Sequence, residues 1–274
     1  MNEIVRERTD FLDRVADVKR VPHGAKAAFD VKMNGVRAFI QAKGATTTRT
    51  RVANRTVLLD TIAVSARPFV NIVELQSGRR NMADLIADAS AQMENAQLGY
   101  IQKVLSEGLN RATNDNYYAS GNGIVKATLD PMIRWFSRMG GVTVLGDIEM
   151  VSQLAAQTGF TAATATQQFS PNAIDEFNRN GYVGAYAGAS VVRLSNPIID
   201  GDELALTTKE LYILPSGIDV GMRPLKVVYE GDVYSVENTN IDDMSFEVRL
   251  DQYFNAAVVY GDRPYMGIYK DTTV

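Results

Sequence analysis

The sequence contains no cysteine and only one histidine, His23. Without cysteine the chain can form no disulfide bond and no thiolate metal site, and a single histidine is too little for a zinc site. His23 follows Pro22 in a segment that we expect to be mobile, so we predict a plain surface position for it and no role as a catalytic base. We predict no catalytic residue, no metal site, no cofactor and no enzymatic activity.

Long apolar runs are missing as well. No stretch of about 18 apolar residues occurs, and residues 1–8 are rich in charge where a signal peptide needs an apolar segment. We therefore expect a protein that is made in, and stays in, a cytosol-like compartment. The 274 residues are 46% hydrophobic, enough for the core of one large domain or two interleaved ones. The net charge of -4 argues against a bulk surface that binds nucleic acid or membrane.

Charge is distributed unevenly along the chain. Every charged residue from Val31 to Leu59 is basic, whereas Ile199 to Asp251 holds 12 acidic residues against four basic ones. Opposite charges on two parts of one chain can attract each other between copies, so the basic residues are candidate contacts between subunits. An ordinary solvated hairpin would explain the same charges equally well. The six candidates are Lys32, Arg37, Lys43, Arg49, Arg51 and Arg55.

The first third of the chain is predicted to form an arm followed by extended β structure. Residues 1–20 are mostly charged with only a loose apolar stripe, which could form a short helix, but most of them suit a flexible arm, and we interpret residues 1–24 as an arm. Alternation over residues 29–33, followed by Asn34-Gly35, predicts a tight hairpin. Its return strand would place Val36, Ala38 and Ile40 opposite Met33, Val31 and Phe29. Residues 56–74 are predicted to continue as extended chain.

The clearest helix follows at residues 82–109, where apolar side chains recur with the three-four spacing of one helix face. Asn81 is the expected N-cap, and Asp84 in the first turn suits the helix dipole. At about 1.5 Å per residue this helix would be roughly 42 Å long, which exceeds the average globular helix. We expect it to run through the centre of its domain.

The rest of the chain predicts short helices and then mostly strands. Asp130-Pro131 predicts the start of a helix that ends at Gly140-Gly141, with Trp135 and Phe136 in the core. Asp147 caps a helix to about residue 157, and Ser170-Pro171 opens another. Turn residues such as Glu230-Gly231-Asp232 separate the strands. The predicted strands are residues 142–145, 190–194, 210–214, 225–229, 245–260 and 265–269.

Two local patterns resemble ligand motifs only weakly. Gly121-Asn122-Gly123 lacks the lysine and serine of a phosphate-binding loop, so we predict a turn there. Residues 200–203 and Asp242-Asp243 are acidic, but they lack the alternating ligand spacing of a calcium loop. Neither pattern predicts a ligand.

Three long segments, in order, resemble one protein family. Thr56 to Gly108 is similar to an extended strand, a long "spine" helix and a glycine turn; Ser170 to Asn196 is similar to a helix, a glycine turn and a strand ending in Ser-Asn. Phe246 to Pro264 is similar to a final long strand and its Arg-Pro step. The family with these elements is the major capsid proteins of tailed double-stranded DNA bacteriophages.

This resemblance implies the Hong Kong ninety-seven-like phage capsid fold, which is an α+β fold. The implied parts are an N-terminal arm at 1–24, an extended β loop at 25–58, a peripheral domain at 59–139 and 223–261 with the spine helix at 82–109, and an axial domain at 140–222 and 262–274.

The resemblance also implies a function. The protein would assemble as pentamers and hexamers into an icosahedral shell around the phage genome, in the host cytoplasm, without sequence-specific DNA binding. Implied partners are further copies, a portal, a separate scaffolding protein and a decoration protein. Some family members cross-link a lysine to an asparagine; Lys43 and Asn255 are of these types, but no motif fixes such a pair.

Two other functions remain open from the sequence. An encapsulin-like compartment would use a similar fold to enclose cargo proteins. A monomeric nucleic-acid-binding module would use the basic segment to contact phosphates.

Overall fold

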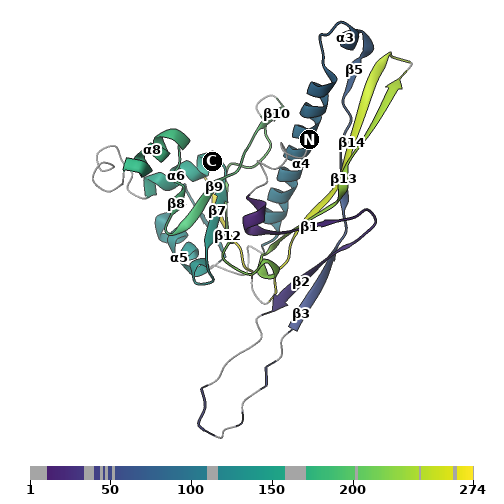
Figure 1. Cartoon of the computed structure of the whole chain (residues 1–274). Helices are drawn as coiled ribbons and strands as arrows, with labels where there is room; N and C mark the ends of the chain where they lie inside the picture. Colours follow the sequence, from purple (N-terminus) through teal and green to yellow (C-terminus); the bar gives the residue numbers. More distant parts are fainter. Residues whose placement is uncertain are drawn as a thin grey trace.

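The computed structural model describes residues 11–33, 40–43, 46, 49–50, 53–109, 117–157, 171–200, 203–240, 242–261 and 264–273. Two sheets organise these residues, one with five strands and one with six (Figure 1). The two-stranded pairs β2–β3 and β10–β11 extend from them on opposite sides of the molecule (Figure 1). The mixture of helices and strands confirms the predicted α+β class.

The five-stranded sheet is long and narrow (Figure 1). Its strand β1 is parallel to β13, and the other pairs are antiparallel. Helix α4 (Met82–Glu107) lies along one face, where its Ala89 and Met93 pack against Val248 and Leu250 of the sheet. The strands in order are β1 (Ala16–Val21), β13 (Leu225–Asn240), β14 (Ser245–Val258) and β4 (Ile62–Ala66), with β5 (Phe69–Asn71) beside the start of β14.

The predicted long helix is confirmed in α4. The side chain of Asn81 accepts a hydrogen bond from the amide of Ala83 at 3.2 Å, as expected of an N-cap, and Asp84 lies in the first turn. The helix ends at Glu107, followed by Gly108, where an added Cβ would clash with Val258. The close approach of α4 to β14 therefore requires glycine at this position.

The six-stranded sheet has its central strands buried along their whole length. Helices α5 (Lys126–Ser137) and α6 (Ile148–Gln157) pack against it, and α8 (Pro171–Asn180) lies at the same end of the molecule (Figure 1). Asp147 accepts a hydrogen bond from the amide of Glu149 at 2.9 Å, which confirms the predicted cap of α6. The strands in order are β6 (Tyr118–Gly121), β15 (Gly267–Asp271), β12 (Glu210–Pro215), β7 (Val142–Gly146), β9 (Ala189–Arg193) and β8 (Ala185–Tyr186).

The remaining elements are short. Within the described ranges no helix is long and apolar enough to cross a membrane. The short elements are α2 (Leu12–Val15), α3 (Ile72–Gln76), β10 (Ile198–Asp200), β11 (Glu203–Leu204) and the 3-10 helix η1 (Val220–Met222).

The interpretation of residues 1–24 as a flexible arm is wrong for the part that is described. Residues 12–15 form α2, and residues 16–21 form β1 at the edge of the five-stranded sheet. Leu12 and Val15 are buried in the main core. These few apolar residues are enough to order the segment, because they are buried in a core whose other side chains come from the rest of the chain.

The predicted pairing of Ile40 with Phe29 across a tight hairpin is also wrong, whereas the turn predicted at Asn34-Gly35 itself lies outside the described residues. Strand β2 (Ala27–Met33) pairs with β3 (Ala53–Leu59), so that Phe29 lies opposite Val57, while Ile40 is fully exposed and outside any strand. Residues 34–39 lie outside the described residues. The pairing with β3 buries Phe29 and Ala27 against Val228, and burial of this apolar face outweighs the local preference for a two-residue turn.

Two other local predictions need correction. Ile72–Gln76 forms α3 instead of extended chain, because the side chain of Asn71 accepts a hydrogen bond from the amide of Val73 at 2.9 Å and caps a helix there. Glu230-Gly231-Asp232 is not a turn, because β13 continues through it with a register shift. Gly231 has a φ of +64°, which suits the irregular backbone of a bulge.

Helix α5 begins at Lys126, not at Asp130, and Pro131 lies inside it. The earlier start places Leu129 in the main core, where it is completely buried. Strand β6 and α5 belong with the six-stranded sheet, so residues 118–137 do not group with α4 as the predicted boundary at 139 implied.

Candidate intersubunit surface

The six basic candidates belong to the segment that leaves the body of the molecule at β2 and β3, here called the extended hairpin (residues 27–59; Figure 1). Lys43, Arg49 and Arg55 are exposed, and no ion pair joins them to another residue in the part of the chain that the structure describes. Lys32 lies in β2, but its side chain is outside the description. Arg37 and Arg51 lie outside the described residues.

The base of the extended hairpin packs firmly on the five-stranded sheet. Phe29 is buried against Val228 of β13, and the Lys19 ammonium lies 5.0 Å from the centre of the Phe29 ring. The same ammonium donates a hydrogen bond to the carbonyl of Ala28 at 2.6 Å. Lys26 forms an ion pair with Asp60 at 2.7 Å across the two chain segments that enter and leave the hairpin. The base is therefore fixed to the body.

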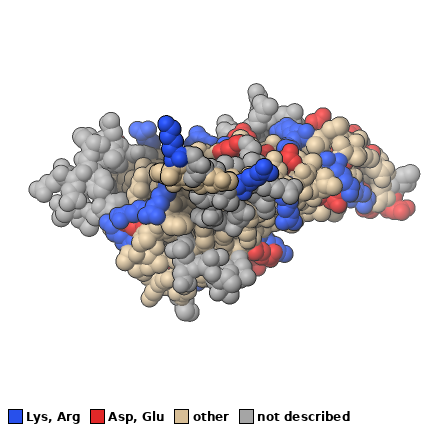
Figure 2. Space-filling view, turned by 90° about the horizontal axis from the view of Figure 1, so that it is seen from below, with Lys and Arg blue, Asp and Glu red and all other residues tan. Residues whose placement is uncertain are grey.

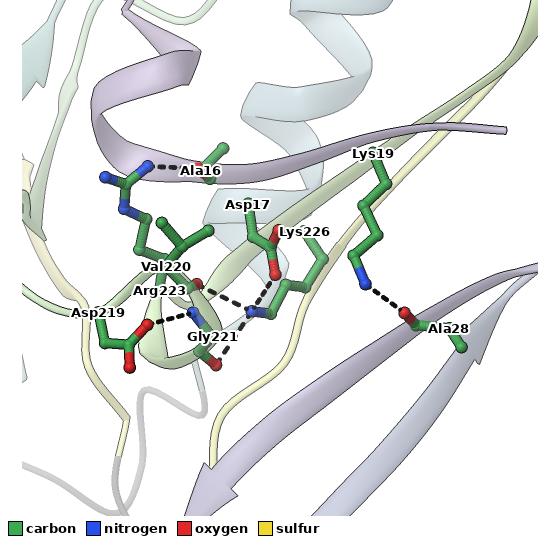
Figure 3. Close-up of polar contacts among 9 residues, drawn as sticks. All are labelled: Ala16, Asp17, Lys19, Ala28, Asp219, Val220, Gly221, Arg223 and Lys226. Atoms are coloured by element: carbon green, nitrogen blue, oxygen red, sulfur yellow. Dashed lines mark hydrogen bonds and ion pairs between the residues drawn. The ribbon is translucent and has the colours of Figure 1, made fainter.

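A buried polar junction joins β1, η1 and β13 next to this base (Figure 3). The Lys226 ammonium donates hydrogen bonds to Asp17 at 2.9 Å and to the carbonyl of Gly221 at 3.2 Å. Arg223 donates to the carbonyl of Ala16 at 2.8 Å. Burial lowers the pKa of Lys226, and the nearby Asp17 carboxylate counteracts part of this effect. The junction holds the N-terminal strand in the sheet.

Glu230 of β13 makes a second set of polar contacts at the hairpin base. Its carboxylate accepts hydrogen bonds from the Gly24 amide at 2.8 Å and from the Thr61 hydroxyl. The His23 ring nitrogen Nδ1 lies 3.5 Å from the same carboxylate. The hydrogen bond from Thr61 first, and then that from Gly24, lower the pKa of Glu230, because both favour the charged carboxylate.

His23 is more than the plain surface residue that we predicted. Its ring packs against the rings of Tyr234 and Tyr253, with centroids 4.9 and 5.4 Å away. Its side chain remains 37% exposed. Sequence reasoning missed this cluster because Gly24, Thr61 and Glu230 are far apart in the chain, and only the glycine after Glu230 signalled an irregular strand.

The acidic residues between Ile199 and Asp251 do not form a uniform partner surface. Glu210 accepts a hydrogen bond from Tyr212. Glu247 pairs with Arg67, and Asp251 pairs with Arg249. Glu230 accepts the hydrogen bonds from Gly24 and Thr61. The exposed acids include Asp232 and Glu237 of β13 and Asp242 of the turn that follows. In the view from below, Lys and Arg are spread over the whole face, while most visible acids lie toward the right, where β13 and β14 lie in Figure 1 (Figure 2).

The asparagine considered for a cross-link is engaged within its own chain. The Asn255 amide donates to the carbonyl of Asp60, and its oxygen accepts a hydrogen bond from the Tyr100 hydroxyl at 3.0 Å. Lys43 is exposed in the extended hairpin. These contacts give Asn255 a structural role at the hairpin base.

The glycine turn at residues 121–123 is filled by protein groups. The Gly123 amide donates to Asp271 at 2.8 Å, and the Tyr269 hydroxyl donates to the Gly123 carbonyl at 2.7 Å. The amide of the turn is thus already satisfied by the Asp271 carboxylate of the same chain. Among the described residues no group of three or more His, Asp or Glu side chains is arranged to hold a metal ion.

Comparison with solved structures identifies the fold. The subunit of the bacteriophage PhiM1 mature capsid is 14% identical and matches with a TM-score of 0.62, covering 96% of this chain and 87% of that one. The acid-stable capsid of Helicobacter pylori bacteriophage KHP30 gives 11% identity and a TM-score of 0.64, covering 94% of this chain and 89% of that one. A virus-like particle from Pyrococcus furiosus gives 12% identity and a TM-score of 0.54, covering 97% of this chain and 94% of that one. The fold is therefore the Hong Kong ninety-seven-like capsid fold.

The sequence itself then places the chain in a family. Residues 1–270 match the family model described as "YonB: SPbeta prophage-derived putative capsid protein YonB". The chain belongs to this family of capsid proteins, which are structural and not enzymatic, and the predicted resemblance to phage capsid proteins is confirmed. No curated protein sequence matches the chain.

Proposed function

We propose that this protein is the major capsid subunit of a tailed phage or prophage and that it assembles as pentamers and hexamers into an icosahedral shell around double-stranded DNA. The observation that carries the proposal is the extended hairpin, which leaves the body with exposed basic side chains that have no acidic partner among the described residues. A segment of this kind gains a partner when a second copy lies beside it. Family membership supports the same function and a place in the virion.

In this proposal the extended hairpin of one subunit lies over the acidic side of its neighbour. Asp232, Glu237 and Asp242 are the exposed acids along β13 and its turn that would receive Lys43, Arg49 and Arg55. The five-stranded sheet with α4 would form the peripheral domain, and the six-stranded sheet the axial domain at the centre of each pentamer or hexamer. A portal, a separate scaffolding protein and a decoration protein would complete the particle. Contacts of obligate assemblies commonly bury about 2,000 Å² or more.

Charge reversal in the extended hairpin tests the electrostatic contact. We expect Arg49→Glu, Arg51→Glu and Arg55→Glu together to reduce shell yield roughly tenfold or more, because each attraction between subunits becomes a repulsion. Electron microscopy and sedimentation of the purified variant measure shell yield. Circular dichroism should show a folded subunit.

The matched control replaces the same three arginines with lysine, which keeps the charge. We expect the lysine variant to form shells, although with fewer bidentate contacts. Normal shell yield from the glutamate variant would contradict the electrostatic contact. Loss of shells in both variants would show that arginine geometry matters more than charge.

A second candidate is a shell that encloses protein cargo instead of a genome. The match to the Pyrococcus furiosus virus-like particle shows that the same fold occurs outside the phage capsids named above. Purified shells that contain protein and no DNA would favour this candidate. A small species whose sedimentation shifts with added DNA would instead favour a monomeric nucleic-acid-binding module, and such binding should weaken steeply as salt rises.

A further inference from the structure

The two ends of the extended hairpin converge on one side chain. The Gly24 amide precedes β2, the Thr61 hydroxyl follows β3, and both donate hydrogen bonds to the Glu230 carboxylate, one to each oxygen. Within the described ranges, strands β2 and β3 pair with each other and with no other strand. The direction of the extended hairpin relative to the body therefore depends on its packed base and on the contacts at these two ends.

The backbone of β13 is shaped for this arrangement. The register of β13 against β14 shifts between Glu230 and Tyr234, and Gly231 within this bulge has a φ of +64°. A Cβ atom on Gly231 would clash with the His23 ring. The bulge and the glycine together leave the space in which His23 lies beside Glu230 and between Tyr234 and Tyr253.

The neighbouring charges leave Glu230 with His23 as its closest ionisable partner. Lys26 and Asp60, on the segments that enter and leave the hairpin, pair with each other at 2.7 Å. On β14, Asp251 pairs with Arg249 at 2.8 Å. Tyr234 and Tyr253 face His23 from β13 and β14. A protonated His23 would add an attraction to the Glu230 carboxylate, 3.5 Å away.

We propose that Glu230 is the positioning residue of the extended hairpin: its carboxylate holds both hairpin ends on β13 and so fixes the direction in which the hairpin reaches the next subunit. Loss of either hydrogen bond would release one end of the hairpin from β13. The consequence for assembly rests on the proposed function, whereas the effect on the hairpin itself belongs to the single subunit.

Acid should weaken the hydrogen bonds that the Glu230 carboxylate accepts. The Thr61 and Gly24 hydrogen bonds lower the pKa of Glu230, so the carboxylate stays charged below the pH at which an ordinary glutamate becomes protonated. A group with a lowered pKa stabilises the folded arrangement at neutral pH, and this stabilisation is lost as the pH falls through the lowered value. The hairpin base should therefore loosen only in clearly acidic solution.

Hydrogen exchange of the full chain at neutral pH tests the proposal. We expect Glu230→Gln to increase amide exchange about tenfold in residues 27–33 and 53–59, since a hydrogen bond to a charged group is lost. Amide exchange in the six-stranded sheet should remain as slow as in the wild type. Glu237→Gln is the matched control, because Glu237 is an exposed glutamate on the same strand. Thr61→Val removes one of the two hydrogen bonds and provides a milder variant if Glu230→Gln does not fold.

A pH series separates positioning from a general loss of stability. Protection of the hairpin relative to the six-stranded sheet should fall in acid for the wild type and for Glu237→Gln, and should be nearly independent of pH for Glu230→Gln. Equal hairpin exchange in the wild type, Glu230→Gln and Thr61→Val would overturn the proposal, whether or not shells form. A loosened hairpin in Glu230→Gln together with normal shells would support the positioning role and contradict the proposed use of the hairpin in assembly.

Discussion

In the six-stranded sheet the central strands β7 and β12 are buried along their whole length, whereas the five-stranded sheet is covered by α4 on one face and, on the other, only near Val228 and Lys226, where the hairpin base and η1 pack on it. On its other face Tyr234 and Val236 are more than half exposed, and Tyr253 is 36% exposed. Gln252 points the opposite way and bonds to Gln97 of α4, as the alternation of side chains along a strand requires.

This difference shows which part of the subunit is complete by itself. The six-stranded sheet has helices of its own to cover its apolar side chains, so its stability should be independent of neighbours. The five-stranded sheet leaves apolar and charged side chains together on an open face, which suits a surface that other copies of the chain cover. Three substitutions can break or sharpen this comparison.

The largest effect should come from the covered sheet. Phe136 of α5 is completely buried, and its ring lies against Gly267 of β15. We expect Phe136→Ala to reduce the free energy of unfolding by about 3–5 kcal/mol, measured by urea denaturation, because it leaves a cavity. Phe69→Ala in the open sheet is the control, since Phe69 is 68% exposed and should cost less than about 1 kcal/mol. Similar losses in both variants would contradict the comparison.

A slightly smaller effect should come from the junction of β1 with β13. Asp17→Ala leaves the buried Lys226 ammonium with only the carbonyls of Val220 and Gly221. We expect a loss of about 3 kcal/mol in the free energy of unfolding, because the counter-charge is gone. The double variant Asp17→Leu with Lys226→Met should recover most of it, since no buried charge remains. A double variant as unstable as Asp17→Ala would show that the charges themselves stabilise the sheet.

The smallest effect should come from the open face. Val236→Ser removes an exposed apolar side chain from β13, so we expect the free energy of unfolding of the isolated subunit to change by no more than about 0.5 kcal/mol. Thermal unfolding of the unassembled protein measures it. A loss above about 2 kcal/mol would mean that this face is covered within the subunit.

The sequence predicted elements whose signals are local. Helix α4 follows from a repeated three-four spacing with a cap at Asn81, and β7 follows from a short run rich in β-branched residues, Val142-Thr143-Val144. The cap of α6 by Asp147 needs only residues two positions apart. The resemblance to capsid proteins added the order of the elements, which no local signal contains.

The errors occurred where distant contacts decide the structure. Asn34-Gly35 favours a tight turn, but β3 pairs with β2 because the pair buries Phe29 against β13. Leu12 and Val15 are too few to predict a packed segment, and their partners lie on other elements. Glu230 gave no signal as a contact site, because its partners Gly24 and Thr61 are 206 and 169 residues away.

That separation also sets an order in time. A ribosome adds about 5–20 residues per second, so the 206 residues between Gly24 and Glu230 correspond to roughly 10–40 s of synthesis. Both strands of the extended hairpin are therefore made long before the carboxylate that bonds to their ends. During this interval a nascent chain lacks both Val228, on which the hairpin base packs, and the carboxylate that holds its ends, which would delay its pairing with neighbouring chains until β13 has been synthesised.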